Sequence, residues 1–245
     1  MSALDRDPNG VLVSMKENCS YVDGIHVVYK ASTHGRRYLD KDAHLKQPGV
    51  AKRVIELLSQ GIIPGAVIIA PETSAETNLG QEVARLIGAD CIPTKKVADK
   101  HTFNPEHLRG LHGRHPRILI DDILNNGATL EQIQEALGGF GLTIDQFRVM
   151  VDRNPEKSSQ LGVPVSALAT VQMDQWNESD VPDDLKQQSI TTKLGKARNW
   201  ILKDGNQPNG QFLLERLHKE RFGFHLDDGM KVGGSEEESL ILIPR

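Results

Sequence analysis

The chain of 245 residues has few cysteines, few aromatic side chains and no long apolar run. Its two cysteines, Cys19 and Cys91, lie far apart in the sequence and match neither a disulfide framework nor the spacing of a zinc site. Aromatic residues make up only 4% of the chain, which disfavours a protein that binds nucleic acid by stacking bases on aromatic rings. The low cysteine content leads us to expect a reducing, cytoplasmic environment.

Apolar runs and charge exclude further classes of protein. No run approaches the roughly 20 residues of a membrane-spanning helix, and the first residues lack the charged-then-apolar form of a signal peptide. The 33 acidic and 29 basic residues give a formal net charge of −4, which disfavours general polyanion binding but would hide one local anion site. We therefore expect neither a membrane nor a nucleic acid as a partner.

Short apolar segments alternate with amphipathic ones along most of the chain. This pattern predicts strands at residues 25–32, 65–70, 90–96, 117–120, 147–152 and 164–171, and helices at residues 49–61, 76–89 and 128–140. Strands that alternate with helices are typical of a parallel sheet covered by helices on both faces, the α/β class.

The alternation is absent from three regions. Residues 1–24 are polar and rich in turn formers, so we expect an irregular lead-in. Residues 97–116 contain four histidines and no sustained period, and a connection of this length is typical of a lid. Near the C-terminus, residues 183–202 and 211–222 have helical character.

The stretch "RILIDDILNNGATL" (117–130) places Asp121 and Asp122 directly after an apolar strand. A turn and a predicted helix follow, so backbone N–H groups should converge there at the positive end of the helix dipole. Gly127 permits close approach of the backbone, and such a turn suits a phosphate. Adjacent carboxylates suit the vicinal hydroxyls or bound cation of the same ligand, as in a ribose 5-phosphate. The plainer alternative is a strand end with a chance acidic pair before a helix cap.

This stretch resembles the phosphoribosyl diphosphate (PRPP) signature of the type I phosphoribosyltransferases, and other segments follow in the order of the orotate branch of that family. "KASTHGRRYLDKDA" (30–43) is similar to the branch's Lys-x-Ser-Gly and Tyr-x-Asp-Lys, although the Gly is missing. "VMVDRNPE" (149–156) resembles a strand ending in Val-Asp-Arg, and "LGVPVSALATV" (161–171) resembles the last core strand. The resemblance covers about residues 25–175.

The resemblance implies a type I phosphoribosyltransferase-like parallel sheet flanked by helices, with a small N-terminal hood and a C-terminal helical extension. It divides the chain into an N-terminal segment with hood strands (1–47), a phosphoribosyltransferase core (48–175) and an extension of unknown role (176–245). It also implies transfer of ribose 5-phosphate from PRPP to a pyrimidine-like base, orotate being the first expectation, with Mg²⁺ as cofactor and a homodimer as the assembly.

Family positions also imply roles for individual residues. Asp121 and Asp122 would hold the ribose hydroxyls and also Mg²⁺, either directly or through water. Lys100 and His101 would stabilise the leaving diphosphate and transfer a proton. The remaining residues implied in PRPP binding come from the turn, the preceding loop and a basic pair: Asn125, Asn126, Gly127, Ala128, Thr129, Thr73, Ser74, Lys95 and Lys96.

Lys30 and Arg153 occupy the family's base-binding positions, although Arg153 would equally suit a surface ion pair. Lys95 and Lys96 also fit an exposed strand edge, and Lys100 with His101 also fits an ordinary loop. The chain departs from the family pattern at two places: Asp99 stands where the catalytic lysine is expected, and the diphosphate loop "APETSAETN" (70–78) contains no glycine.

These departures leave two further interpretations open. The chain could transfer the phosphoribosyl group to another base, because the diphosphate loop is altered. It could instead be a non-catalytic PRPP-binding or nucleotide-binding regulatory protein with the same fold, because both the loop and the lysine position differ from the family pattern.

Overall fold

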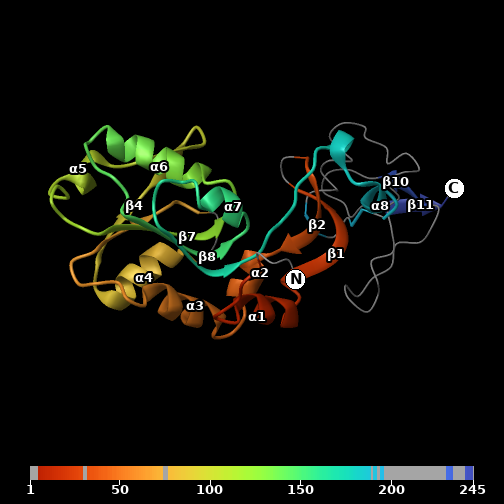
Figure 1. The fold of residues 1–245 in the computed structure, drawn as a ribbon, viewed down its shortest axis with the longest axis horizontal. Coiled ribbons are helices and arrows are strands. Elements are labelled where there is room, and N and C mark those ends of the chain that lie inside the picture. Colours follow the sequence, from red (N-terminus) through yellow and green to blue (C-terminus); the bar gives the residue numbers. More distant parts are fainter. Residues whose placement is uncertain are drawn as a thin grey trace. The chain divides into compact units, whose positions relative to one another are not determined.

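The computed structural model of the chain describes residues 5–29, 32–73, 77–188, 190–191, 194–195, 230–233 and 241–244 (Figure 1). The chain divides into two compact units, one formed by residues 1–18 and 40–172 and the other by residues 19–39 and 173–245. We call the first the sheet unit and the second the hairpin unit, after their principal elements.

A five-stranded parallel sheet forms the centre of the sheet unit. In spatial order its strands are β4 (Asp90–Pro93), β3 (Val67–Ala70), β7 (Arg117–Leu124), β8 (Gln146–Asp152) and β9 (Val165–Thr170). Every residue of β3 is buried, as is every residue of β7 before Asp121. Continuous burial is what a parallel strand covered on both faces requires, so the predicted α/β class is confirmed.

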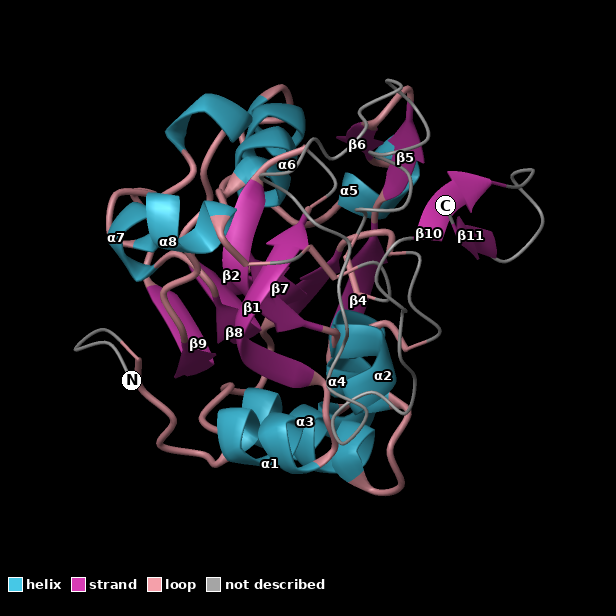
Figure 2. Ribbon diagram, turned by 90° about the vertical axis from the view of Figure 1, so that its right-hand side faces the viewer, coloured by secondary structure: helices cyan, strands magenta, loops and turns pink. Residues whose placement is uncertain are grey.

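Helices cover both faces of the sheet (Figures 1 and 2). One face carries α6 (Ala128–Gly138), and the other carries α1 (Val11–Glu17), α3 (Val50–Ser59) and α4 (Leu79–Ile87). α6 buries Leu130, Ile133 and Leu137, which share one helical face, in a core with the side chains of β3, β7 and β8. The short helices α2 (Lys41–Leu45), α5 (Pro105–Leu108) and α7 (Pro155–Ser158) complete the unit.

α4 packs directly on the end of β3. The Asn78 side chain caps the helix by accepting the N–H three residues later, at 3.1 Å, and Gly88 ends it with a φ of 67°. A Cβ at Gly80 would lie 2.9 Å from the Cβ of Ala70, so this approach requires glycine. The helix thereby fixes the point at which residues 71–73 leave the sheet.

The strand order reverses between β3 and β7. From β3 the chain runs through α4 to β4 at one edge, returns past β3 to β7, and then continues outward to β8 and β9. In open parallel sheets, ligands bind beyond the carboxyl ends of the strands at such a reversal. Residues 71–73 follow β3, and the acidic pair lies near the end of β7, so the topology and the sequence motif indicate the same place.

Three predicted regions differ in detail from the structure. The expected irregular lead-in contains α1, whose buried Val11, Leu12 and Met15 give it an apolar face short enough to be missed. The predicted strand at 90–96 is interrupted, because β4 ends at Pro93 and a separate strand begins at Lys95. The predicted loop at 97–116 contains the second strand of an antiparallel hairpin, β5 (Lys95–Val97) with β6 (Lys100–Thr102), and then α5.

The hairpin unit is built on the antiparallel pair β1 (Tyr21–Val28) and β2 (His34–Leu39). Its described C-terminal elements are η1 (Glu178–Asp180), α8 (Asp183–Lys186) and the antiparallel pair β10 (Met230–Gly233) and β11 (Ile241–Pro244). The predicted helix at 211–222 lies outside the described residues. Within the described part of the chain, no helix has the length and apolar character needed to span a membrane.

Candidate functional site

The acidic pair lies within β7 rather than after it. β7 continues through Ile123 and Leu124, because Ile123 pairs with β8 and Leu124 is buried in the core. The Asp122 N–H donates to the Asp121 carboxylate at 2.9 Å. Burial, followed by the neighbouring charge of Asp122, raises the pKa of Asp121 to about 7. The strand therefore holds two carboxyl groups close together, one of which binds a proton far more readily than a free aspartate.

A cation offsets this repulsion. The Lys41 ammonium, at the first position of α2, forms an ion pair with the Asp122 carboxylate. Lys41 and Lys96 both lower the pKa of Asp121, against the two larger effects that raise it. The sequence analysis did not assign Lys41 to the site, and the only available signal was its place after Asp40 in the Tyr-x-Asp-Lys segment.

A turn at residues 125–127 joins β7 to α6, which begins at Ala128, as the motif predicted. Gly127 precedes the first helical residue with a φ of 82°, which favours glycine, and a Cβ there would lie 2.5 Å from Cδ2 of Leu161, so that side chain would have to move. The Asn126 side chain accepts the Ala128 N–H at 3.1 Å. Because this N–H lies at the helix N-terminus, the turn already carries an oxygen where an anion is expected to bind.

Lys95, Lys96, Lys100 and His101 all lie on the β5–β6 hairpin, where Lys96 pairs with His101 across the two strands. The Glu72 carboxylate, from the loop after β3, accepts the Lys96 N–H. A negative charge therefore lies at the side of the site where the resemblance implies a diphosphate, as the glycine-free loop suggested.

His101 is buried, with 4% of its surface exposed. Its Nδ1 lies 2.7 Å from the Thr94 hydroxyl, which accepts the Glu72 N–H at 2.9 Å. Its backbone N–H donates to the Gln132 side chain of α6 at 3.3 Å. Burial, and then the charge of Lys96, lowers the pKa of His101, so the imidazole is neutral at pH 7. The β5–β6 hairpin is thus attached to both the central sheet and α6.

A cavity of about 360 Å³ opens beside the hairpin. Thr73 and Lys95, both predicted to bind PRPP, line it. Its other lining residues come from the loop after β3, the start of α4, the end of β4 and the segment after β6: Glu72, Asn78, Gln81, Pro93, Thr94, Asn104 and His107. The size and the mixed donors and acceptors suit a small polar group such as a diphosphate.

For the remaining predicted residues, the structure gives less detail about their place in the site. Arg153 follows β8, and its N–H donates to the Leu124 carbonyl at 2.8 Å, which puts its backbone beside the end of β7. Thr129 is the second residue of α6. Lys30 and Ser74 lie outside the described residues.

The acidic pair alone does not fit a resident Mg²⁺. This ion prefers six oxygen ligands in an octahedron. Asp121 and Asp122 supply only two carboxyl groups, and Lys41 occupies one of them. The described ranges contain no group of three or more His, Cys, Asp or Glu side chains that could hold a metal. Any Mg²⁺ would therefore need most of its ligands from a bound substrate and water.

Known proteins were compared with this chain in three ways. No protein-family model and no curated sequence matches it. Among solved structures, adenine phosphoribosyltransferase from Rhodothermus marinus is similar with a TM-score of 0.51 and 15% identity, over 66% of this chain and 98% of that one. Orotate phosphoribosyltransferase from Aeropyrum pernix gives a TM-score of 0.48 and 16% identity, over 65% and 93% of the two chains.

The identities are too low to carry a substrate from these structures to this chain, but the likeness to the Rhodothermus marinus structure spans nearly all of that protein. It agrees with the five-stranded parallel sheet and the helices that flank it. The chain therefore has the type I phosphoribosyltransferase fold.

Proposed function

We propose that this protein is a phosphoribosyltransferase that moves ribose 5-phosphate from PRPP to a ring nitrogen of a pyrimidine-like base, orotate being the first candidate, and releases diphosphate. One observation carries the proposal. The acidic pair lies near the carboxyl end of β7, at the strand reversal, and the same strand leads directly into a glycine-containing turn at the N-terminus of α6.

Each part of that arrangement suits one part of PRPP. The N–H groups of the turn would bind the 5-phosphate. Asp121 and Asp122 would accept hydrogen bonds from the ribose hydroxyls, next to the positive charge that develops at the anomeric carbon as the bond to diphosphate breaks. Lys95, Lys96 and Lys100 of the β5–β6 hairpin would stabilise the negative charge of the departing diphosphate. Mg²⁺ would then come with the substrate rather than from the protein, and it would supply positive charge to the departing diphosphate.

The decisive experiment measures diphosphate release by the full chain in the presence of PRPP and Mg²⁺, with orotate, uracil and adenine offered separately. Release that depends on orotate supports the proposal as stated. Release with another base alone keeps the reaction and changes the acceptor. A reaction without any base gives the hydrolysis background for each measurement.

A second function is supported by a separate observation, the contact of Glu72 with the hairpin. A carboxylate beside the diphosphate site weakens binding of the leaving group, and His101 is buried rather than exposed to substrate. A non-catalytic protein that binds PRPP or a nucleotide would have these properties. Calorimetry with PRPP, together with absent diphosphate release on every base, would support this second function.

A further inference from the structure

The ion pair between Lys41 and Asp122 joins two parts of the sheet unit that are distant in the sequence. Asp122 lies on β7 with 10% of its side chain exposed, and Lys41 lies on α2 with 27% exposed. Removing one member of such a pair leaves a largely desolvated charge without its partner, which is strongly unfavourable. The contact should therefore be important for the conformation of the acidic pair.

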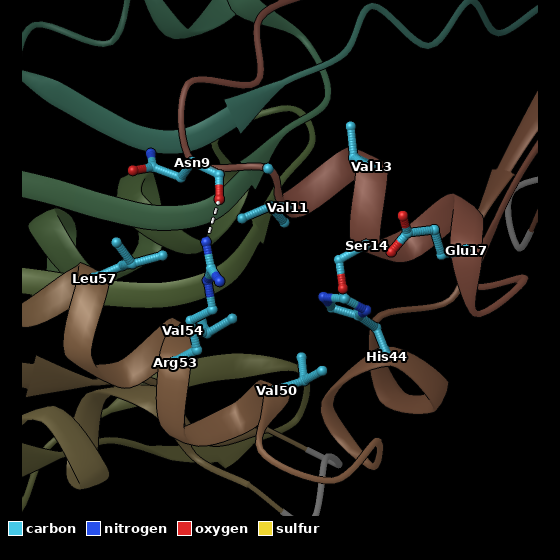
Figure 3. A pocket seen from close by; sticks show the side chains of 11 residues that line it. Asn9, Val11, Val13, Ser14, Glu17, His44, Val50, Arg53, Val54 and Leu57 are labelled. Carbon is cyan, nitrogen blue, oxygen red and sulfur yellow. Dashed lines mark hydrogen bonds between the residues drawn. The ribbon is translucent and has the colours of Figure 1, made fainter.

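α2 is held in place on both sides of Lys41. The Asp40 side chain caps the helix by accepting the Ala43 N–H at 2.9 Å. One turn later, buried His44 is hydrogen-bonded through Nδ1 to the Asn18 side chain at 2.9 Å. Figure 3 shows the His44 side chain close to Ser14 of α1, at one side of a cavity of about 220 Å³ between α1 and α3. The ammonium thus projects from an anchored helix.

We propose that Lys41 is the resident cation of the acidic pair: it takes the place that a divalent ion would otherwise fill and positions Asp122 for its ligand. The two carboxylates are adjacent in the chain, and the Asp121 carboxylate accepts the Asp122 backbone N–H, so both acidic groups lie close together and need a nearby positive charge. Among the described side chains, the Lys41 ammonium is the cation in contact with Asp122. Only the last part, positioning for a ribose, rests on the proposed function.

A double-mutant cycle tests the pairing without any substrate. We expect Lys41→Met to lower the Tm by about 5 °C, because it leaves the Asp122 charge unpaired. Asp122→Asn in the Lys41→Met background should recover most of that loss, and Lys41→Arg should stay near the wild type. Lys52→Met is the matched control, because the Lys52 side chain is exposed on α3 and its ammonium lies 3.9 Å from the Glu56 carboxylate. Additive effects of the two substitutions would overturn the proposal.

Mn²⁺ tests whether the lysine replaces a metal ion. Millimolar Mn²⁺ should raise the Tm of Lys41→Met but leave the wild type and the Lys41→Met/Asp122→Asn double variant unchanged, because only the single variant has both carboxylates without a cation. An equal response of the wild type and Lys41→Met, whether both are stabilised or neither is, would contradict the assignment.

Kinetics then test positioning. In a turnover assay, Lys41→Met should raise the KM for PRPP about tenfold, and Lys41→Arg should restore most of it; tenfold corresponds to about 1.4 kcal/mol. A wild-type-like KM in Lys41→Met would remove the positioning role. If the wild type itself shows no turnover, the proposed reaction fails, whereas the Tm cycle and the Mn²⁺ response still decide whether Lys41 is the cation of the pair.

Discussion

The side of the candidate site proposed for the ribose phosphate comes from one uninterrupted segment, β7 with the turn that follows it, whereas the side proposed for the diphosphate is assembled from three segments of the chain. They are the loop after β3 with Glu72, the stretch from Thr94 through the β5–β6 hairpin with Lys96 and His101, and α6 with Gln132. A continuous segment keeps its geometry through strand and helix hydrogen bonds. A side assembled from several segments is held by several separate contacts. One substitution there removes only one of them, so it should have a smaller effect.

The largest expected effect is on the continuous side. Asp121→Asn combined with Asp122→Asn should reduce diphosphate release by about 10³-fold or more, because the carboxylates act next to the developing positive charge. Circular dichroism should show an intact fold. The adjacent aspartates of α8 provide the matched control, since Asp183→Asn with Asp184→Asn makes the same change at exposed positions. Retained activity in the first variant would remove the assigned role.

The next effect concerns the turn itself. Gly127→Ala should lower the free energy of unfolding by about 2 kcal/mol, because alanine is strained at a φ of 82° and its Cβ would displace the Leu161 side chain. Urea unfolding measures the change. Gly138→Ala, at the other end of α6, meets no atom within 4 Å and should be neutral or slightly stabilising. Equal effects at both glycines would contradict the assignment of strain to the turn.

A smaller effect is expected on the assembled side. Glu72→Gln removes a negative charge but keeps an oxygen that can accept the Lys96 N–H, so the KM for PRPP should fall by about threefold. The exposed Glu82 of α4 pairs with Arg85, and Glu82→Gln is the control for a general charge effect. A KM that rises in Glu72→Gln would show that this carboxylate helps to bind the substrate.

The smallest effect is a pH dependence of stability. Since the pKa of His101 is lowered in the folded state, the unfolded chain binds a proton below about pH 6.5 that the folded chain does not, and the free energy of unfolding falls as the pH drops. His101→Gln should make the free energy of unfolding less dependent on pH, and the change in slope should be smaller than the slope that one bound proton produces. Urea unfolding between pH 5 and 7 measures it, and the exposed His112→Gln should keep the original slope.

The sequence predicted the continuous side of the site better than the assembled side. The strands with continuous apolar residues, such as β3, and the turn after the acidic pair were predicted because local spacing determines them. The β5–β6 hairpin was missed because its two three-residue strands have no period long enough to detect, and its stability comes from contacts with Thr94 and Gln132. Lys41 was missed for a related reason, since its partner lies 81 positions away.

In the turn, the Asn126 side chain accepts the Ala128 N–H, so this donor already has a partner within the protein. A phosphate that enters the turn has to exchange that contact for its own, so the net gain at this N–H is the difference between two hydrogen bonds. A small free anion obtains little from such an exchange. A sugar phosphate bound as we propose would also reach the acidic pair and recover the difference there. We therefore expect the turn to favour ligands that carry a ribose over inorganic phosphate.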